Sequence, residues 1–376
     1  ACTPYHGMRA QAAISACERA SAWQRCLPLL SGMRLHRLEP GLAAYRCVAR
    51  ACGRGAAWWP AVEILATMQR SSVADESGSV WSATWWACEA AGVRAVEHVM
   101  GPAPGLAAKE VQLLRHVKQE ASEGDLHGVI EAIEGFAATH QWLKIAGGAK
   151  AELLRGCLRS GDRVVEFGAY VGYSALVAVE RLRQLGGGSV VSCEVDALVA
   201  EVARAVIAWA GATEEIEVRV GCASDWATSG RLPRADVLVL DHRGPLYHRD
   251  LRLMEPSLAP GARVFADNVL HPGAPLLLSY VKGRYDVAVH EVEEFLHDPV
   301  LEDWVLVCTL HPEALHSPVV AITPPELRQL SAEVDRMCQR SMIGTVDWAA
   351  FQKRVKTALR PWRAAFASEL RLPRRD

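Results

Sequence analysis

The sequence predicts an α/β protein with a doubly wound, Rossmann-like sheet, preceded by an α-helical repeat solenoid and followed by a short helical tail. Three observations lead to this prediction. Short apolar segments alternate with helical patterns between Asp162 and Leu310, as expected for a parallel sheet with helices on both faces. A repeat of about 35 residues runs through residues 1–95, and two helical patterns follow His311. The predicted domains are 1–100, 101–310 and 311–376.

Composition limits the class of protein. The 376 residues include 41 Lys and Arg and 43 Asp and Glu, and a net charge of -2 gives no overall attraction to nucleic acid or anionic membranes. No apolar run approaches the roughly 20 residues that span a bilayer, so no membrane partner is expected. The 11 cysteines form no C-x-x-C pair, which indicates free thiols in a reducing compartment, cytoplasmic or organellar. Because the sequence begins with Ala1 rather than Met, a targeting segment could be missing from it.

The N-terminal repeat is recognised from residues that recur about 35 positions apart. Each unit has the pattern of two short amphipathic helices, with small residues and Cys in the first and Trp, Leu and Met in the second. Such a unit cannot bury its apolar face alone, so the units are expected to stack. The recurring positions are Ala16-Cys17, Ala51-Cys52 and Ala87-Cys88, and Trp23, Leu30 and Met33 with Trp58, Leu65 and Met68.

The segment A-I-S-A-C-E-R-A-S-A-W-Q-R-C-L-P-L-L-S-G-M resembles the pentatricopeptide repeat family. That resemblance implies binding of single-stranded RNA, one base per repeat, through side chains on the first helix of each unit. Gln11, Arg46 and Ser82 occupy the positions that would contact bases, and Gly41 stands where the family usually has a polar group. Two and a half units with these residues would discriminate RNA sequences poorly, so a role as a scaffold or in protein contact is favoured over RNA binding.

A break in the helical pattern at Gly101-Pro-Ala-Pro-Gly105 predicts the boundary between the repeats and the sheet domain. Apolar residues at helical spacing then predict helices at 109–118, 129–136 and 150–157. Apolar segments predict strands near 164–167, 189–193, 216–220, 236–240, 262–266, 285–292 and 304–310.

In the tail, Thr323 is the predicted N-cap of a helix, with Pro324 as its first residue and Glu326 completing a capping box. A second helix is predicted from about Thr345. It is basic, but its simplest interpretation is a helix packed on a domain, with Trp348, Phe351, Val355 and Leu359 on its inner face.

The turn after the first strand is the main candidate for ligand binding. Gly168 and Gly172 bracket it and a helix follows, so the backbone can approach a ligand beside the helix N-terminus. The G-x-x-x-G spacing differs from the dinucleotide pattern G-x-G-x-x-G. Glu166 would repel a phosphate but could accept from an amino group, and Glu194 lies where such folds hold ribose hydroxyls. The set suits S-adenosylmethionine, although a glycine turn alone occurs in other α/β domains.

Acidic residues follow two further strands. Asp241 ends one strand, and Asp267 and Asn268 end the next. Because the carboxyl ends of parallel strands open onto one crevice, these oxygen ligands match a hard cation such as Mg²⁺. Taken separately, Asp241 and Asp267 could equally be helix caps or turn residues.

Four motifs together resemble the catechol O-methyltransferase family from about Lys109 to Leu310: V-V-E-F-G-A-Y-V-G-Y-S, C-E, L-D-H and A-D-N-V-L-H-P-G-A-P. The resemblance implies Mg²⁺- and S-adenosylmethionine-dependent transfer of a methyl group to one hydroxyl of a catechol. It assigns Mg²⁺ to Asp241, Asp267 and Asn268, and the substrate to Asn268, Arg243 and His297. The residues that it assigns to the cofactor are Ala146, Glu166, Gly168, Tyr170, Gly172, Ser174, Glu194, Ala223, Asp241 and His242.

The substrate side departs from the family pattern. The family has D-H-W-K where this chain has D-H-R-G, so Gly244 replaces the lysine base and Arg243 replaces a tryptophan gate. The family glutamate that anchors the second hydroxyl is His297 here, and an imidazole could accept that hydrogen bond or act as base. Lys144, in place of a family methionine, is a second candidate base.

Three functions remain open from the sequence. The favoured one is an active O-methyltransferase on a catechol-like or altered diol. The others are a cofactor- and metal-binding protein with little turnover, and an RNA-associated repeat protein.

Overall fold

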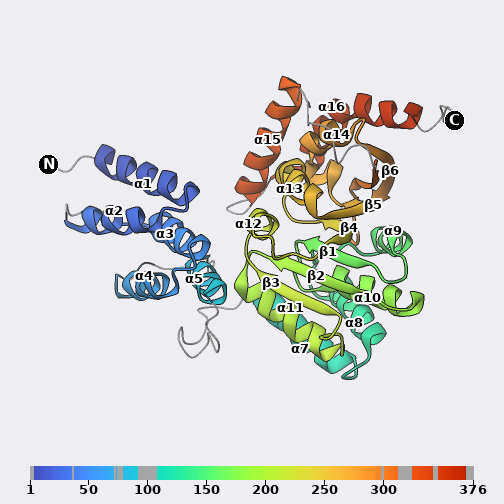
Figure 1. Cartoon of the computed structure of the whole chain (residues 1–376), viewed down its shortest axis with the longest axis horizontal. Coiled ribbons are helices and arrows are strands. Elements are labelled where there is room, and N and C mark those ends of the chain that lie inside the picture. The colour runs from blue at the N-terminus through green and yellow to red at the C-terminus, as the bar shows by residue number, and fades with distance from the viewer. Residues whose placement is uncertain are drawn as a thin grey trace. The chain divides into compact units, whose positions relative to one another are not determined.

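The computed structural model describes residues 4–35, 38–71, 73, 79–91, 108–297, 300–311, 324–341 and 346–369 (Figure 1). The chain divides into two compact units, Ala1–Gln112 with Val195–Val202, and Leu113–Glu194 with Ala203–Asp376. The predicted boundary at 101–105 lies outside the described residues. In the described part of the chain, no helix combines the length and apolarity needed to cross a membrane.

The first unit contains paired helices. Helix α1 packs on α2 and α3 packs on α4, while α3 also contacts α1 and α5. Repeat-related positions are buried alike, because Leu30 and Leu65, and Met33 and Met68, are each at most 6% exposed. The assignment to the pentatricopeptide family stays a prediction. The helices are α1 (Pro4–Arg19), α2 (Trp23–Leu35), α3 (Leu42–Arg54), α4 (Trp58–Arg70) and α5 (Ser79–Ala90).

The second unit is built on a seven-stranded sheet of order β3-β2-β1-β4-β5-β7-β6. All seven predicted strands are present. The sheet is not wholly parallel, however, because β7 runs antiparallel to both β5 and β6. The short connection between β6 and β7 has no room for a crossover helix, so the chain can only turn back. The strands are β1 (Arg163–Phe167), β2 (Ser189–Glu194), β3 (Ile216–Val220), β4 (Ala235–Leu240), β5 (Leu258–Ala266), β6 (Tyr285–Glu293) and β7 (Glu302–Leu310).

Helices form two groups around this sheet. Helices α8 and α9 pack on α10, whereas α13, α14 and α15 form a second connected group (Figure 1). The predicted helices before the sheet are present. The bounds are α7 (Ala108–Glu120), α8 (Leu126–Thr139), α9 (Ala149–Cys157), α10 (Tyr173–Leu185), α11 (Ala197–Trp209), α12 (Ala223–Thr228), α13 (Tyr247–Met254) and α14 (Pro275–Val281).

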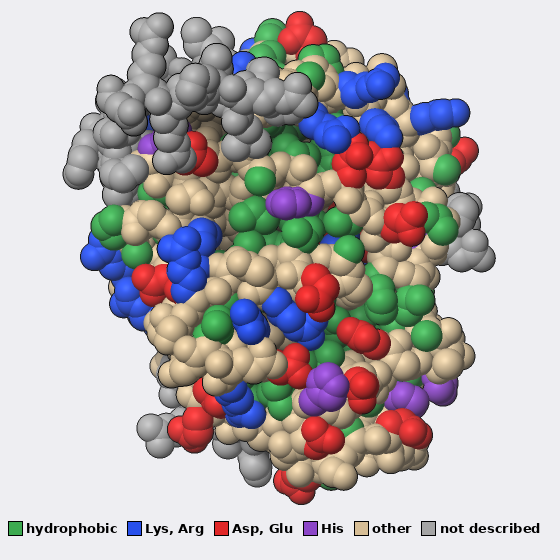
Figure 2. Space-filling view, turned by 90° about the vertical axis from the view of Figure 1, so that its right-hand side faces the viewer, with side chains coloured by type: hydrophobic (Ala, Val, Ile, Leu, Met, Phe, Trp, Pro, Cys, Tyr) green, Lys and Arg blue, Asp and Glu red, His purple; other side chains and the backbone are tan. Residues whose placement is uncertain are grey.

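The tail forms α15 (Pro325–Ser341) and α16 (Trp348–Glu369). Helix α15 begins one residue after Pro324, which therefore precedes the helix instead of opening it; Thr323 and Thr345 lie outside the described residues. Ion pairs link α16 to the last two strands, with Lys356 contacting Glu302 and Arg363 contacting Glu291. On the face shown in Figure 2, acidic and basic side chains lie next to one another.

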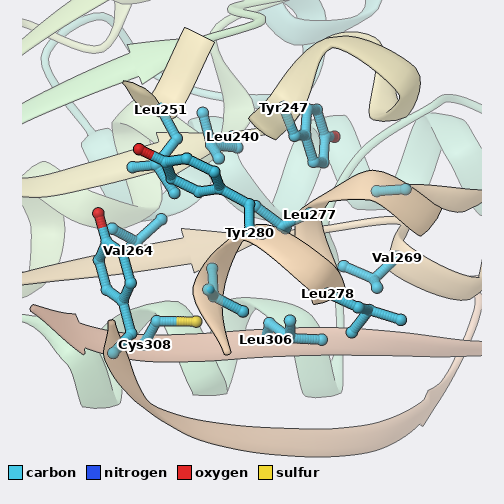
Figure 3. Close-up of a cluster of buried hydrophobic side chains, with 14 of the residues drawn as sticks. Leu240, Tyr247, Leu251, Val264, Val269, Leu277, Leu278, Tyr280, Leu306 and Cys308 are labelled. Carbon is cyan, nitrogen blue, oxygen red and sulfur yellow. The ribbon is translucent and has the colours of Figure 1, made fainter. Parts of the chain in front are cut away.

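One hydrophobic cluster joins the sheet to the tail. Val165 and Phe167 of β1 belong to it. Leu251 of α13 and Leu278 of α14, which Figure 3 labels, belong to the same cluster. Because strand side chains alternate, Glu166 points to the other face of the sheet. The tail contributes Val334, Phe351, Val355 and Leu359, all at most 8% exposed. The predicted inner face of α16 is therefore confirmed, and the tail shares the core of the second unit.

Candidate functional site

The glycine turn joins the ends of β1, β2 and β4. A Cβ atom at Gly168 would lie 2.3 Å from the carbonyl oxygen of Asp241, and the φ of Gly168 is +106°, so only glycine fits. Gly172, with φ +86°, precedes α10. The backbone N–H of Tyr170 donates to Glu194 Oε2 over 2.9 Å, which ties the turn to the end of β2. Five residues predicted to hold the cofactor thus lie together: Gly168, Tyr170, Gly172, Glu194 and Asp241.

Glu166 lies inside the protein. It is 1% exposed, and the Ser192 hydroxyl donates to its carboxylate. Burial raises the pKa of Glu166, while hydrogen bonds from Ser174 and Ser192 act against that shift. The Glu166 carboxylate at the end of β1 thus accepts from two hydroxyls, those of Ser174 and Ser192.

His242 has a buried nitrogen without a partner among the described residues. Its Nε2 lies 2.9 Å from Asp250 Oδ2, whereas its Nδ1 is buried and makes no hydrogen bond. The ring is flanked by Phe167 and Tyr247, at 5.6 and 5.0 Å between centroids. An orphaned polar atom at the end of β4 is a fitting contact for a polar ligand. Ala223 opens α12, and Ala146 is buried before α9.

The three predicted metal ligands share one edge of the sheet. Asp267 is 2% exposed, and the backbone N–H of Asn268 donates to its Oδ1 over 2.7 Å. Asn268 adopts a left-handed conformation, with φ +56°. Burial and then the charge of Asp267 raise the pKa of Asp241 well above its usual range, which reports the proximity of the two carboxyl groups.

Sequence reasoning missed a lysine-centred cluster, made of Lys150, Asp267, Glu294 and Asp303. The Lys150 Nζ atom lies 2.8 Å from Asp267 Oδ1, 2.6 Å from Glu294 Oε2 and 2.9 Å from Asp303 Oδ2. The side-chain amide of Asn268 donates to Asp303 over 3.2 Å and to Glu294 over 3.4 Å. A lysine near the start of a helix after two glycines was visible in the sequence, but Asp267 follows β5, and Glu294 and Asp303 lie beyond β6.

The charges of this cluster determine its protonation. Burial lowers the pKa of Lys150, but three carboxylates outweigh it and raise that pKa well above its usual value, so the ammonium stays charged. Burial raises the pKa of Glu294 to about 7 against the opposing charge of Lys150.

The donor set suits a hard cation. The carboxyl groups of Asp267, Glu294 and Asp303 face one ammonium, and the charge of Asp267 acts on the nearby Asp241. Carboxyl groups therefore outnumber the ammonium, and the Asn268 amide adds a neutral oxygen. Oxygen ligands with net negative charge are what Mg²⁺ prefers. Among the described residues, no three His, Cys, Asp or Glu side chains form a ready metal site; the candidate ligands are two carboxylates and an amide.

The two predicted bases lie in different surroundings. His297 follows β6, where its backbone N–H donates to the Glu294 carbonyl over 3.3 Å. Its ring lies edge-on to Trp142, at 5.3 Å between centroids. Lys144, by contrast, is exposed on the segment that leads to α9.

The structure explains the two residues after β4, Arg243 and Gly244, that differ from the family pattern. Arg243 is exposed, and its Nη2 lies 2.6 Å from Asp335 Oδ1 of α15, so its guanidinium is held by the tail rather than placed freely over a substrate. A Cβ atom at Gly244 would lie 2.3 Å from the carbonyl oxygen of Gly273. This backbone contact leaves no room for a lysine at position 244.

Comparison with known proteins identifies the family of the chain. A family model described as a methyltransferase domain matches residues 165–269. Catechol O-methyltransferase B of Danio rerio is 35% identical over 179 residues, covering 46% of this chain and 67% of that protein. Catechol O-methyltransferase of Bos taurus is 32% identical over 199 residues, covering 50% and 72%.

Among solved structures, an O-methyltransferase of Bacillus cereus in complex with SAH is 18% identical, with a TM-score of 0.41, and covers 58% of this chain and 97% of that one. From the identity and the coverage of its curated relatives, the chain belongs to the catechol O-methyltransferase family, within the S-adenosylmethionine-dependent methyltransferases.

Proposed function

We propose that this protein transfers a methyl group from S-adenosylmethionine to one hydroxyl of a catechol or related diol, with Mg²⁺ held by Asp241, Asp267 and Asn268. The observation that carries the proposal is the excess of carboxyl groups over ammonium groups at this edge of the sheet, next to the glycine turn. A diol that has lost one hydroxyl proton is an anion, and these carboxylates would repel it unless a cation lay between them.

Different residues of the chain would bind the cofactor and position the acidic groups. Glu194 would accept from the ribose hydroxyls, and His242 Nδ1 would meet a polar atom of the cofactor, whose sulfonium supplies an electrophilic methyl group. Bound Mg²⁺ would lower the pKa of a coordinated hydroxyl. Lys150 holds Asp267, Glu294 and Asp303 in place before ligands arrive, so little reorganisation is needed during the reaction.

We assign the base to His297. Its ring lies beside Trp142, and its backbone N–H donates to the carbonyl of Glu294, a member of the lysine-centred cluster, whereas Lys144 is exposed. A neutral imidazole can take the proton of the attacking hydroxyl, which is the task that Gly244 cannot perform.

Labelled S-adenosylmethionine tests the proposal directly. Methyl transfer to a simple catechol should require Mg²⁺, stop with a chelator, and fall at least 100-fold in Asp267→Ala. The matched control is Asp286→Ala, an exposed acid on β6 that pairs with His311. Turnover that survives chelator would refute the role of Mg²⁺.

A second function, a cofactor- and metal-binding protein with little turnover, is favoured by one observation. Gly244 packs against Gly273, and Arg243 is paired with Asp335, so neither position can supply the family's base or gate. Calorimetric binding of S-adenosylhomocysteine and Mg²⁺, without turnover of any diol, would support this function.

For the N-terminal repeats we propose contact with a protein, and RNA as the alternative. Arg46 is exposed, whereas the side chain of Ser82 lies outside the described residues and Gln11 lies 4.0 Å from Cys47 Sγ. A mobility-shift assay of the full chain with single-stranded RNA, repeated with Arg46→Ala, separates the two: retention lost in the variant would favour RNA.

We also propose that the protein works in a reducing compartment, cytoplasmic or organellar. The ten described cysteines are free thiols, and seven of them are buried. Burial raises the pKa of Cys157 to about 11, which keeps that thiol protonated and unreactive.

A further inference from the structure

The two C-terminal helices pack on the loops that carry the candidate site. Helices α15 and α16 both contact the turn Val269–Gly273, which directly follows Asn268, and α15 also contacts the turn Gly244–Leu246, which follows Arg243. Side chains of Val334 and Val355 come within 3.3 and 3.4 Å of the Cβ position at Gly273. The tail therefore touches the substrate side of the site rather than a remote face.

Four rings form a row along this side. They are Trp142, His297, His271 and Trp348, and we call them the aromatic row. The ring centroids of Trp142 and His297 lie 5.3 Å apart, those of His297 and His271 lie 6.2 Å apart, and those of His271 and Trp348 lie 5.1 Å apart, with neighbouring rings edge to face. Trp348 is the first residue of α16, and it is only partly buried.

The row borders polar residues of the site. His271 and Asn268 lie in the same loop, and the backbone N–H of His271 donates to Asp303 Oδ1 over 2.8 Å. His271 Nδ1 is buried without a hydrogen-bond partner among the described residues. A diol held by oxygen ligands at Asn268 would therefore carry its ring toward an aromatic boundary, where planar rings bind edge to face or stacked.

We propose that Trp348 forms the outer wall of the acceptor site, so that the C-terminal extension selects aromatic acceptors. This inference rests on the proposed O-methyltransferase function. Asp335 is a positioning residue in the same arrangement, because its ion pair with Arg243 fixes α15 against the turn after β4. The acceptor class that this wall fits is a planar phenolic diol.

Steady-state kinetics of the full chain test the proposal. Trp348→Ala should raise KM for catechol roughly 3- to 10-fold, the loss of one aromatic contact, and leave KM for S-adenosylmethionine unchanged. Trp348→Phe should restore most of the affinity. The matched control is Trp362→Ala, on the same helix, whose ring lies 5.6 Å from Lys282 Nζ rather than in the aromatic row.

Binding of catechol to the protein loaded with S-adenosylhomocysteine and Mg²⁺, measured by calorimetry, separates the possible failures. If the wild type binds catechol and Trp348→Ala binds it equally well, Trp348 does not form a wall of the acceptor site, and the proposed function stands. If the wild type binds catechol without turnover, affinity alone tests the wall. If the wild type binds no catechol, the proposed function and the wall both fail. Should Trp348→Ala not fold, Trp348→Leu, which keeps the bulk and removes the ring, takes its place.

Discussion

At the scale of single residues, Lys150 carries the electrostatics of the site. It is fully buried, and its three ion pairs leave no carboxylate of the lysine-centred cluster without a cationic partner. A buried ion pair is no guarantee of stability, because desolvation offsets the attraction between its charges. Removal of one partner is nevertheless costly, because the remaining charges stay buried.

Lys150→Met should therefore lower the free energy of unfolding by about 3–5 kcal/mol, as expected when a buried charge network loses its cation. Urea unfolding at pH 7.5 measures the change. Lys353→Met, at an exposed position of α16, should change stability by less than about 0.5 kcal/mol. Equal effects in both variants would show that the cluster contributes nothing beyond the loss of one lysine.

His271 gives the site a pH dependence of known sign. Burial, with smaller contributions from His297 and Lys150, lowers the pKa of His271 to about 4. The unfolded chain, with an ordinary histidine pKa, takes up the proton first as pH falls. The stability associated with neutral His271 is thus complete above pH 6.5 and lost as the pH falls toward 4.

A comparison with His271→Phe, which keeps a ring but cannot titrate, isolates this effect. Between pH 7.5 and pH 5, the wild type should lose about 2 kcal/mol more stability than the variant. Urea unfolding without added divalent cations at both pH values measures the difference. Parallel loss in the two proteins would mean that His271 is protonated as easily in the fold as outside it.

At the scale of elements, the tail helices belong to the core of the methyltransferase unit. Leu359 and Val355 are fully buried in the same cluster as strand residues Val264 and Leu306. Since apolar burial scales with the area removed from water, this shared cluster couples α16 to the sheet more strongly than its surface ion pairs do.

Leu359→Ala should consequently destabilise the unit by about 2–4 kcal/mol, from lost burial and the cavity left behind. Arg360→Ala, the neighbouring exposed position, should change stability by less than about 0.5 kcal/mol. Thermal unfolding of both variants, followed by circular dichroism, measures the two changes in stability. If the tail were only loosely attached, Leu359→Ala would change stability as little as Arg360→Ala.

At the scale of the whole molecule, the chain has two compact units, each with its own buried residues. A ligand that binds only the native state of one unit stabilises that unit by mass action. The candidate cofactor residues from Ala146 to Glu194, and the site beyond β4, all fall within the second unit.

S-adenosylhomocysteine at 100 times its Kd should raise the unfolding free energy of the second unit by about 2.7 kcal/mol and leave the first unit unchanged. Calorimetric scans with and without the ligand would resolve the two transitions. Glu194→Ala provides the control, since it removes the predicted ribose contact and should abolish the shift. A shift shared by both transitions would mean that the units unfold together.

Local chemistry determined much of this protein in advance. Apolar residues placed all seven strands, in continuous runs such as β1 or alternating with polar residues as in β3 and β6, and the inner face of α16 followed from helical spacing. The glycine turn and the acids Asp241 and Asp267 were visible because each belongs to a short motif at a strand end. The direction of β7 was not visible in the sequence, because strand pairing depends on how the chain turns in space rather than on the apolar pattern.

Tertiary structure decided the contacts between distant residues. Lys150 and Glu294 are 144 positions apart and Arg243 and Asp335 are 92 apart, so no local pattern links either pair. The same holds for the contact of Gly244 with Gly273 and for the ring of Trp348 beside His271. The sequence by itself determined the positions of the strands, the glycine turn and the strand-end acids. Only folding decided the direction of β7, which charges compensate the acids and which rings border them, because those choices depend on packing across the whole unit.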